Sequence, residues 1–149
     1  MSRAPTPLHL TNHEKVVVAF GYWPLFHDAE VRSLKLDRNQ TLFEGVSNPQ
    51  IELVIHALEW TEAKDDAPPS FNHHLVHLNF EEVDDVQLSG FNHQNALYSV
   101  RFEIAEVVTG GMARHRVGLD PAHGLGGSFT YARGHVVSIV PCSDQGAPR

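Results

Sequence analysis

The sequence has few of the residues that common catalytic and structural sites need. Its one cysteine, Cys142, excludes an internal disulfide and a zinc site built from several thiolates. It contains no Gly-x-Ser-x-Gly, no His-Glu-x-x-His and no cysteine beside a suitable base. No apolar run approaches the roughly 20 residues that span a bilayer, and residues 1–12 lack the apolar segment of a signal peptide. We therefore expect a cytoplasmic protein without a membrane segment, metal or cofactor.

Charge is also scarce, and it is mostly of one sign. Charged residues make up 19% of the chain, and 18 Asp and Glu outnumber 11 Lys and Arg, for a net charge of −7. Such a surface repels phosphate backbones and anionic lipids, which argues against nucleic-acid or membrane binding and favours a basic partner. With 42% hydrophobic residues in 149 positions, we expect a single domain over residues 1–149, with loose ends at 1–12 and 142–149.

The hydrophobic pattern repeats mainly every two residues, which predicts strands. The clearest alternation runs from Ala96 to Ile104, and it predicts a central strand with Tyr98, Val100 and Phe102 buried. Residues 51–60 are apolar on both faces, as in a strand covered on both sides.

Turn-forming residues predict three hairpins. The turns lie at the polar stretch 64–72, at Gly110 and Gly111, and at Arg133 and Gly134. Only residues 12–20 look helical, with Asn12 at the N-cap. The predicted fold class is therefore mainly β: an antiparallel meander of seven or eight strands, forming a sandwich or strongly curved sheet, with one short N-terminal helix.

The stretch GYWPLFHDAEV, residues 21–31, contains the first candidate site. His27, Asp28 and Glu30 are residue types that serve as acid–base pairs or metal ligands. In a strand, Asp28 and Glu30 would point to one face and His27 to the other, so the three converge only through a bulge or turn. The structural interpretation is that the His-Asp pair hydrogen-bonds the turn, while the apolar residues before it close an edge of the core: Trp23, Leu25 and Phe26.

Two later stretches are rich in histidine and asparagine. In FNHHLVH, residues 71–77, His73 and His77 lie four positions apart, which is roughly 13 Å in a strand and too far for one metal ion. GFNHQN, residues 90–95, suits a turn, because asparagine side chains satisfy turn backbone and glycine adopts positive φ. Neither stretch predicts a metal site.

Together, GYWPLFHDAEV and GFNHQN resemble the immunity protein 50 family of bacterial polymorphic-toxin systems. The first resembles an aromatic-Trp-Pro-x-Phe-His-Asp-x-Glu-Val segment, and the second a Phe-x-His-Gln-Asn segment that precedes a strand. The likeness extends over roughly residues 16–108. We interpret the matching residues as structural, since toxin-binding surfaces usually vary from pair to pair: Trp23, Pro24, Phe26, His27, Asp28, Glu30, Val31, Phe91, His93, Gln94 and Asn95.

The resemblance implies a cytoplasmic protein, not an enzyme, that binds and neutralises a cognate toxin domain. An acidic inhibitor suits a basic toxin such as a nuclease. The candidate contacts are carboxylates in the predicted connections: Asp65, Asp66, Glu81, Glu82, Asp84 and Asp85. The last four occupy five positions with no basic residue among them to pair with, so we expect an exposed acidic patch.

Two other functions remain open. A small β-fold enzyme or metal-binding protein would use His27, Asp28 and His93, together with His123, and should gather them in one concave pocket. The third hypothesis is a structural or ligand-binding accessory domain.

Overall fold

The protein is built almost entirely of antiparallel strands. The computed structural model describes residues 3–62, 68–107 and 113–149. In these ranges one helix is followed by ten strands: α1 (His13–Phe20), β1 (Glu30–Asp37), β2 (Thr41–Phe43), β3 (Val46–Ser47), β4 (Gln50–Trp60), β5 (Ser70–Glu81), β6 (Asp84–Ser89), β7 (Leu97–Glu106), β8 (Arg114–Pro121), β9 (Gly126–Tyr131) and β10 (Arg133–Pro141).

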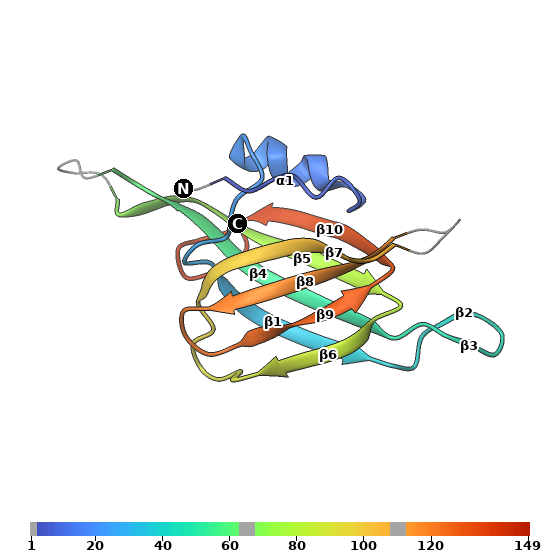
Figure 1. Cartoon of the computed structure of the whole chain (residues 1–149). Coiled ribbons are helices and arrows are strands. Elements are labelled where there is room, and N and C mark those ends of the chain that lie inside the picture. Colours follow the sequence, from blue (N-terminus) through green and yellow to red (C-terminus); the bar gives the residue numbers. More distant parts are fainter. Residues whose placement is uncertain (1–2, 63–67, 108–112) are drawn as a thin grey trace.

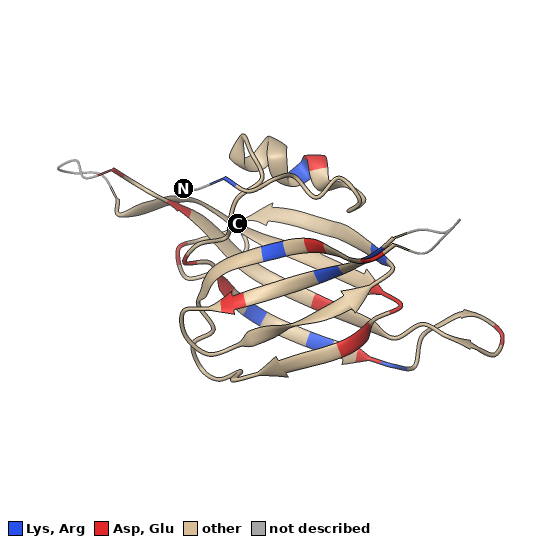
Figure 2. Ribbon diagram, viewed as in Figure 1, with Lys and Arg blue, Asp and Glu red and all other residues tan. Residues whose placement is uncertain are grey.

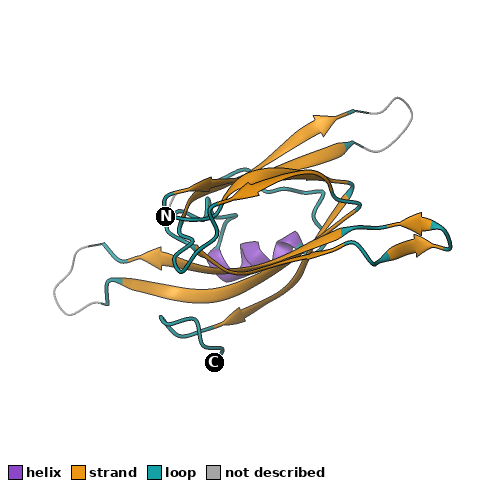
Figure 3. Cartoon of the chain, turned by 90° about the horizontal axis from the view of Figure 1, so that it is seen from below, coloured by secondary structure: helices purple, strands orange, loops and turns teal. Residues whose placement is uncertain are grey.

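Eight of these strands form two four-stranded sheets that pack face to face (Figure 1). One sheet has the order β1-β4-β5-β10 and the other β6-β9-β8-β7, while β2 and β3 form a separate ribbon. Seen from below, the strands lie in two layers (Figure 3). The predicted fold class, a mainly β antiparallel sandwich with one short N-terminal helix, is confirmed.

The core lies between the two sheets. The ring of Phe80 in β5 is 5.1 Å from Phe129 and 4.6 Å from Tyr131, both in β9 of the opposite sheet. Every second side chain of β4 and β5 points into this interior. The fully buried ones are Ile51, Leu53, Ile55, Ala57, Val76, Leu78 and Phe80.

The outer face of β4 departs from the expected burial. Val54 and Leu58 are only partly covered, and Trp60 is 48% exposed. The prediction of a strand covered on both sides is therefore wrong. A two-sheet sandwich has one interior, so the second face of each sheet is directed toward solvent whatever its residues.

The predicted helix forms as α1, beside β10, and buries Val16 and Phe20. Asn12 is at the N-cap position, but its side chain makes no capping bond and instead donates to the Val136 carbonyl at 3.4 Å. Packing therefore stabilises this valine-rich helix, whose intrinsic propensity is low. None of the described residues belongs to a helix long and apolar enough to cross a membrane.

Strand β7 lies at an edge of its sheet, not at the centre. Register shifts between Leu97 and Ser99 move Ser99 inward and leave Tyr98 60% exposed. Val100 is buried as predicted, Phe102 is half-buried, and the prediction for Tyr98 is wrong because the bulge reverses the alternation there. The β7–β8 hairpin is confirmed, although its predicted turn at residues 110–111 lies outside the described residues.

Strands β9 and β10 do not form the predicted hairpin. The chain turns at Ala132, and β10 then pairs with β5 in the opposite sheet. The Ala132 N–H donates to the Glu81 carbonyl at 3.0 Å, which fixes this change of sheet. Any side chain at Gly134 would collide with Leu10. Since β5 and β6 also lie in different sheets, only β4–β5 and β7–β8–β9 follow the expected meander.

Both ends of the chain make specific contacts where we expected loose segments. Leu10 is buried, and the Ala4 N–H donates to the Trp23 carbonyl at 3.0 Å. Cys142 is buried and its N–H donates to the His73 carbonyl, also at 3.0 Å. Leu10 and Cys142 thus pack against the sandwich, while most of residues 143–149 are exposed.

Candidate functional site

The His-Asp pair of the first motif sits in a turn between α1 and β1. His27 Nε2 lies 3.4 Å from Asp28 Oδ2, and His27 Nδ1 hydrogen-bonds the Tyr98 carbonyl at 3.1 Å. The pair converges because Phe26 and Asp28 both have φ of 64°, in the left-handed region. This is the turn that convergence required. The two side chains bond Tyr98 and Trp60, and not the backbone of the turn as the structural interpretation expected.

Two exposed aromatic residues flank this pair, one from each sheet. Trp60 at the end of β4 donates from Nε1 to Asp28 Oδ2 at 2.9 Å. The Tyr98 ring near the start of β7 meets the His27 ring edge to face, with centroids 5.2 Å apart. We call Trp60, Asp28, His27 and Tyr98 the aromatic patch. Sequence analysis missed it, because alternation assigned both aromatic residues to buried faces.

The other motif residues hold the two sheets together. The Asn95 N–H donates to Glu30 Oε2 at 3.3 Å, and its carbonyl accepts from the Val31 N–H at 3.0 Å. The buried Asn95 amide also accepts from the Leu125 N–H at 3.1 Å and bonds the Asn92 backbone. The two motifs, more than sixty residues apart in sequence, therefore meet where β1 approaches β7.

The apolar members of the first motif lie in the core. Trp23 and Phe26 are both buried, with their rings 5.9 Å apart and roughly perpendicular. Trp23 also meets Phe102 of β7 at 5.8 Å. The predicted closure of the core edge by these two side chains is confirmed, and Leu25 beside them is half-buried.

The residues of the alternative enzyme or metal site do not share a pocket that the structure describes. His93 and His123 are exposed, and neither is bonded to His27 or Asp28. Among the described residues no group of three or more His, Cys, Asp or Glu side chains is placed to hold a metal ion. Gln94 and Phe91 of the second motif are exposed as well.

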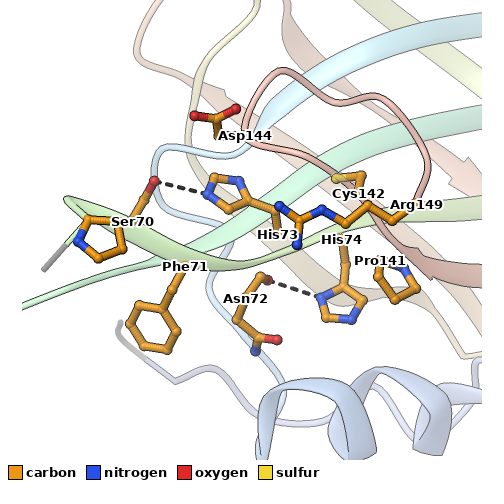
Figure 4. Close-up of a pocket in the computed structure, with 10 residues that line it drawn as sticks. Ser70, Phe71, Asn72, His73, His74, Pro141, Cys142, Asp144 and Arg149 are labelled. Carbon is orange, nitrogen blue, oxygen red and sulfur yellow. Dashed lines mark hydrogen bonds between the residues drawn. The ribbon is translucent and has the colours of Figure 1, made fainter.

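An open pocket of about 600 Å³ lies between the β4–β5 end and residues 141–149 (Figure 4). Inside it Ser70 Oγ and His73 Nε2 are 3.0 Å apart, and His73 Nδ1 is 2.8 Å from Nε2 of the buried His56. Burial, with the neighbouring His73 and Arg32, lowers the pKa of His56, so its ring is neutral at pH 7 and can accept this bond. The chain of bonds satisfies the hydrogen-bonding capacity of the buried His56.

The acidic run at 81–85 is paired, contrary to the expectation of unpaired carboxylates. Glu81 accepts from Arg133, from His135 at 2.5 Å and from Asn48 at 3.0 Å, and its side chain is only 20% exposed. Burial by itself would raise the pKa of Glu81, but these hydrogen bonds outweigh it and lower the pKa to about 2. Glu81 is thus an internal ion-pair partner.

Its neighbours are paired too. Glu82 accepts from Arg133 at 2.5 Å, and Asp85 accepts from Arg116 at 3.0 Å. Local sequence does not indicate these cations, because they lie 51 and 31 residues away along the chain. Figure 2 shows acidic and basic residues interspersed over both sheets, so residues 81–85 do not form the expected unpaired acidic patch. Asp84 is exposed, and Asp65 and Asp66 lie outside the described residues.

Comparison with known proteins gives one family. The model of a family described as Immunity protein 50 matches residues 12–111, which include both motifs and the whole aromatic patch. No curated protein and no solved structure matches the chain.

Proposed function

Since the chain belongs to the immunity protein 50 family, we propose that it binds a cognate bacterial toxin domain in the cytoplasm and inhibits it without chemistry of its own. The family match carries this proposal. The net charge of −7 supports a basic toxin, such as a nuclease that holds phosphates. Inhibition by binding alone requires only a stable surface. The β-sandwich, whose two motifs meet where β1 approaches β7, provides one.

The test is titration of toxin activity with the chain. The probe is the toxin domain encoded beside this gene, assayed on its own substrate. An inhibitor that acts by binding should abolish activity at about one equivalent, and a toxin domain from an unrelated pair should be unaffected. Protection at far below one equivalent would instead favour the enzyme hypothesis, and no protection at any ratio would contradict the proposed function.

We also propose a role for the acidic residues Asp65, Asp66 and Asp84 in the rate of toxin binding. Asp65, Asp66 and Asp84 would attract a basic toxin over distances of about a Debye length, roughly 8 Å at physiological ionic strength. Glu82 and Asp85 contribute less because Arg133 and Arg116 offset their charges, and Glu81 is withdrawn from the candidate contacts because it is bonded internally.

A further inference from the structure

We propose that the aromatic patch is the surface that contacts the toxin, and that a lysine or arginine side chain of the toxin domain packs on the exposed Trp60 ring beside the Asp28 carboxylate. This inference rests on the proposed function and specifies where the partner binds and with which chemistry. It concerns Trp60, Tyr98, His27 and Asp28, which the structure brings together from β4, β7 and the turn before β1.

The patch exposes two large aromatic side chains. Trp60 is 48% exposed and Tyr98 is 60% exposed, although both have large apolar rings. Tryptophan and tyrosine carry a disproportionate share of binding energy at protein interfaces. Single exposed apolar residues are ordinary, but here two aromatic rings flank one His-Asp pair across the junction of two sheets.

Hydrogen bonds hold the aromatic patch rigid before any partner binds. The Asp28 N–H donates to the Leu97 carbonyl at 2.8 Å, and the Asp28 carboxylate in turn holds the Trp60 indole. His27 is fixed by the Tyr98 carbonyl. Side chains that are already ordered lose little conformational entropy on binding, which raises the affinity gained per contact.

The backbone of the turn supports the same conclusion. Phe26 and Asp28, on either side of His27, both adopt a left-handed conformation that costs non-glycine residues of order 1 kcal/mol or more. The burial of the Phe26 side chain accounts for one of these. The left-handed conformation of Asp28 places an exposed carboxylate beside Trp60 and His27.

The charge of the Asp28 carboxylate is available to a partner. The Asp28 side chain is 40% exposed, and in the described part of the chain its ion-pair neighbour is His27, with no lysine or arginine within 4.0 Å. This distinguishes Asp28 from Glu82 and Asp85, whose charges are offset within the molecule. A carboxylate next to an exposed tryptophan ring is suited to binding a cation. Arginine fits best, because its guanidinium can pair with the carboxylate and stack on the ring.

Dissociation kinetics with the same toxin domain test the patch. Trp60→Ala and Tyr98→Ala should each raise the dissociation rate at least tenfold, with little change in the association rate. Asp28→Asn keeps an oxygen for the Trp60 indole but removes the charge, so we expect an increase of about fivefold that shrinks at high salt. The matched control is Phe43→Ala, an aromatic residue in β2 that is 66% exposed, which should stay within about twofold of wild type.

Fluorescence quenching tests the same surface without a mutation. The chain has two tryptophans, and Trp23 is buried, so iodide should quench Trp60 alone in the free protein. In the complex with a toxin domain whose own tryptophans have been replaced by phenylalanine, this quenching should disappear.

The outcomes separate the two proposals. Failure of the wild-type chain to bind the toxin contradicts the proposed function and this inference with it. A wild-type complex that tolerates Trp60→Ala and Tyr98→Ala, and in which Trp60 stays open to iodide, contradicts the patch alone. Self-association in the ultracentrifuge that Trp60→Ala abolishes would assign the patch to a second copy of the chain and overturn the inference.

Discussion

Trp23 is the largest fully buried side chain, and the fold depends on it more than on any neighbouring motif residue. Trp23→Ala should lower the free energy of unfolding by about 3–5 kcal/mol, because the sandwich cannot collapse around the space left beside Phe26 and Phe102. Denaturant titration measures this loss. Trp23→Phe is the milder comparison, since the indole N–H has no partner among the described residues and its removal leaves none of their polar groups unpaired. A loss below about 1 kcal/mol for Trp23→Ala would place the residue outside the core.

Glu81 makes stability depend on pH in acid. Its folded pKa of about 2 lies below the ordinary carboxyl value of 4.5, so its contribution is complete above pH 4.5 and is lost as the pH falls toward 2. Glu81→Gln should therefore lower the unfolding free energy by about 1–3 kcal/mol at pH 7, and the difference from wild type should vanish near pH 2. Parallel pH profiles for the two proteins would show that the Arg133 and His135 bonds do not stabilise the fold.

His9 acts at a higher pH. Burial, and then the neighbouring His115 and His13, lower the pKa of His9 from 6.5 to about 4. The unfolded chain thus binds the proton more readily, and stability should decline as the pH falls from 6.5 to about 4. His9→Gln should make this decline smaller, because His56 and His115, whose pKa values burial also lowers, supply the remainder, and it should leave the lower Glu81 window intact. A decline of the same size in this variant would assign it to other groups.

At the residue scale, the sequence predicts burial well for large apolar side chains, which are most stable in the core. Trp23 and Phe26 are large and apolar, and both lie in the core. The exposure of Tyr98 could not be predicted, because the bulge before Ser99 reverses the side-chain alternation. No residue type at this position indicates a bulge. The cationic partners of Glu81 and Glu82 were unpredictable for another reason: Arg133 reaches them only after the chain has changed sheets.

At the scale of elements, β7 consists of two halves with different hydrogen bonding. The Leu97 N–H donates to the Ala29 carbonyl and the Val100 N–H to the Leu25 carbonyl. By alternation, the amides of Phe102 and Ile104 point the same way as that of Val100, and no described backbone carbonyl accepts them. Native-state hydrogen exchange should therefore show slow amides at 97 and 100 and fast ones at 102 and 104. Uniformly slow exchange along β7 would contradict its position at the sheet edge.

The same scale shows what turn signals can and cannot predict. Alternating segments and turn residues locate most strands of the sandwich, including β4, β5 and β8–β10, within a few positions. They do not say which sheet the next strand joins, because a turn at Ala132 serves a hairpin or a crossing between sheets equally well. The crossing depends on the Glu81 carbonyl and on the space at Gly134, both of which are tertiary features.

For the whole molecule, the net charge predicts how toxin binding responds to salt. Asp65→Asn, Asp66→Asn and Asp84→Asn together change the formal charge from −7 to −4 with little change in shape. The association rate should fall several-fold at low salt and converge with wild type as salt rises, while the dissociation rate stays unchanged. Stopped-flow mixing at several salt concentrations measures both rates. Equal salt slopes would remove these three residues from the attraction.

The last strands complete a sandwich whose earlier strands cannot close it. β10 pairs with β5, and Thr11 bonds Gly134 and Val136, so the first and last parts of the chain meet in one layer. A ribosome delivers them about 6 to 25 seconds apart, at about 5–20 residues per second. Until β10 emerges, β5 has an open edge, which is a surface prone to pairing with other chains. The nascent chain must therefore keep this edge unpaired while the later strands are synthesised, and the first sheet is completed only when β10 leaves the ribosome.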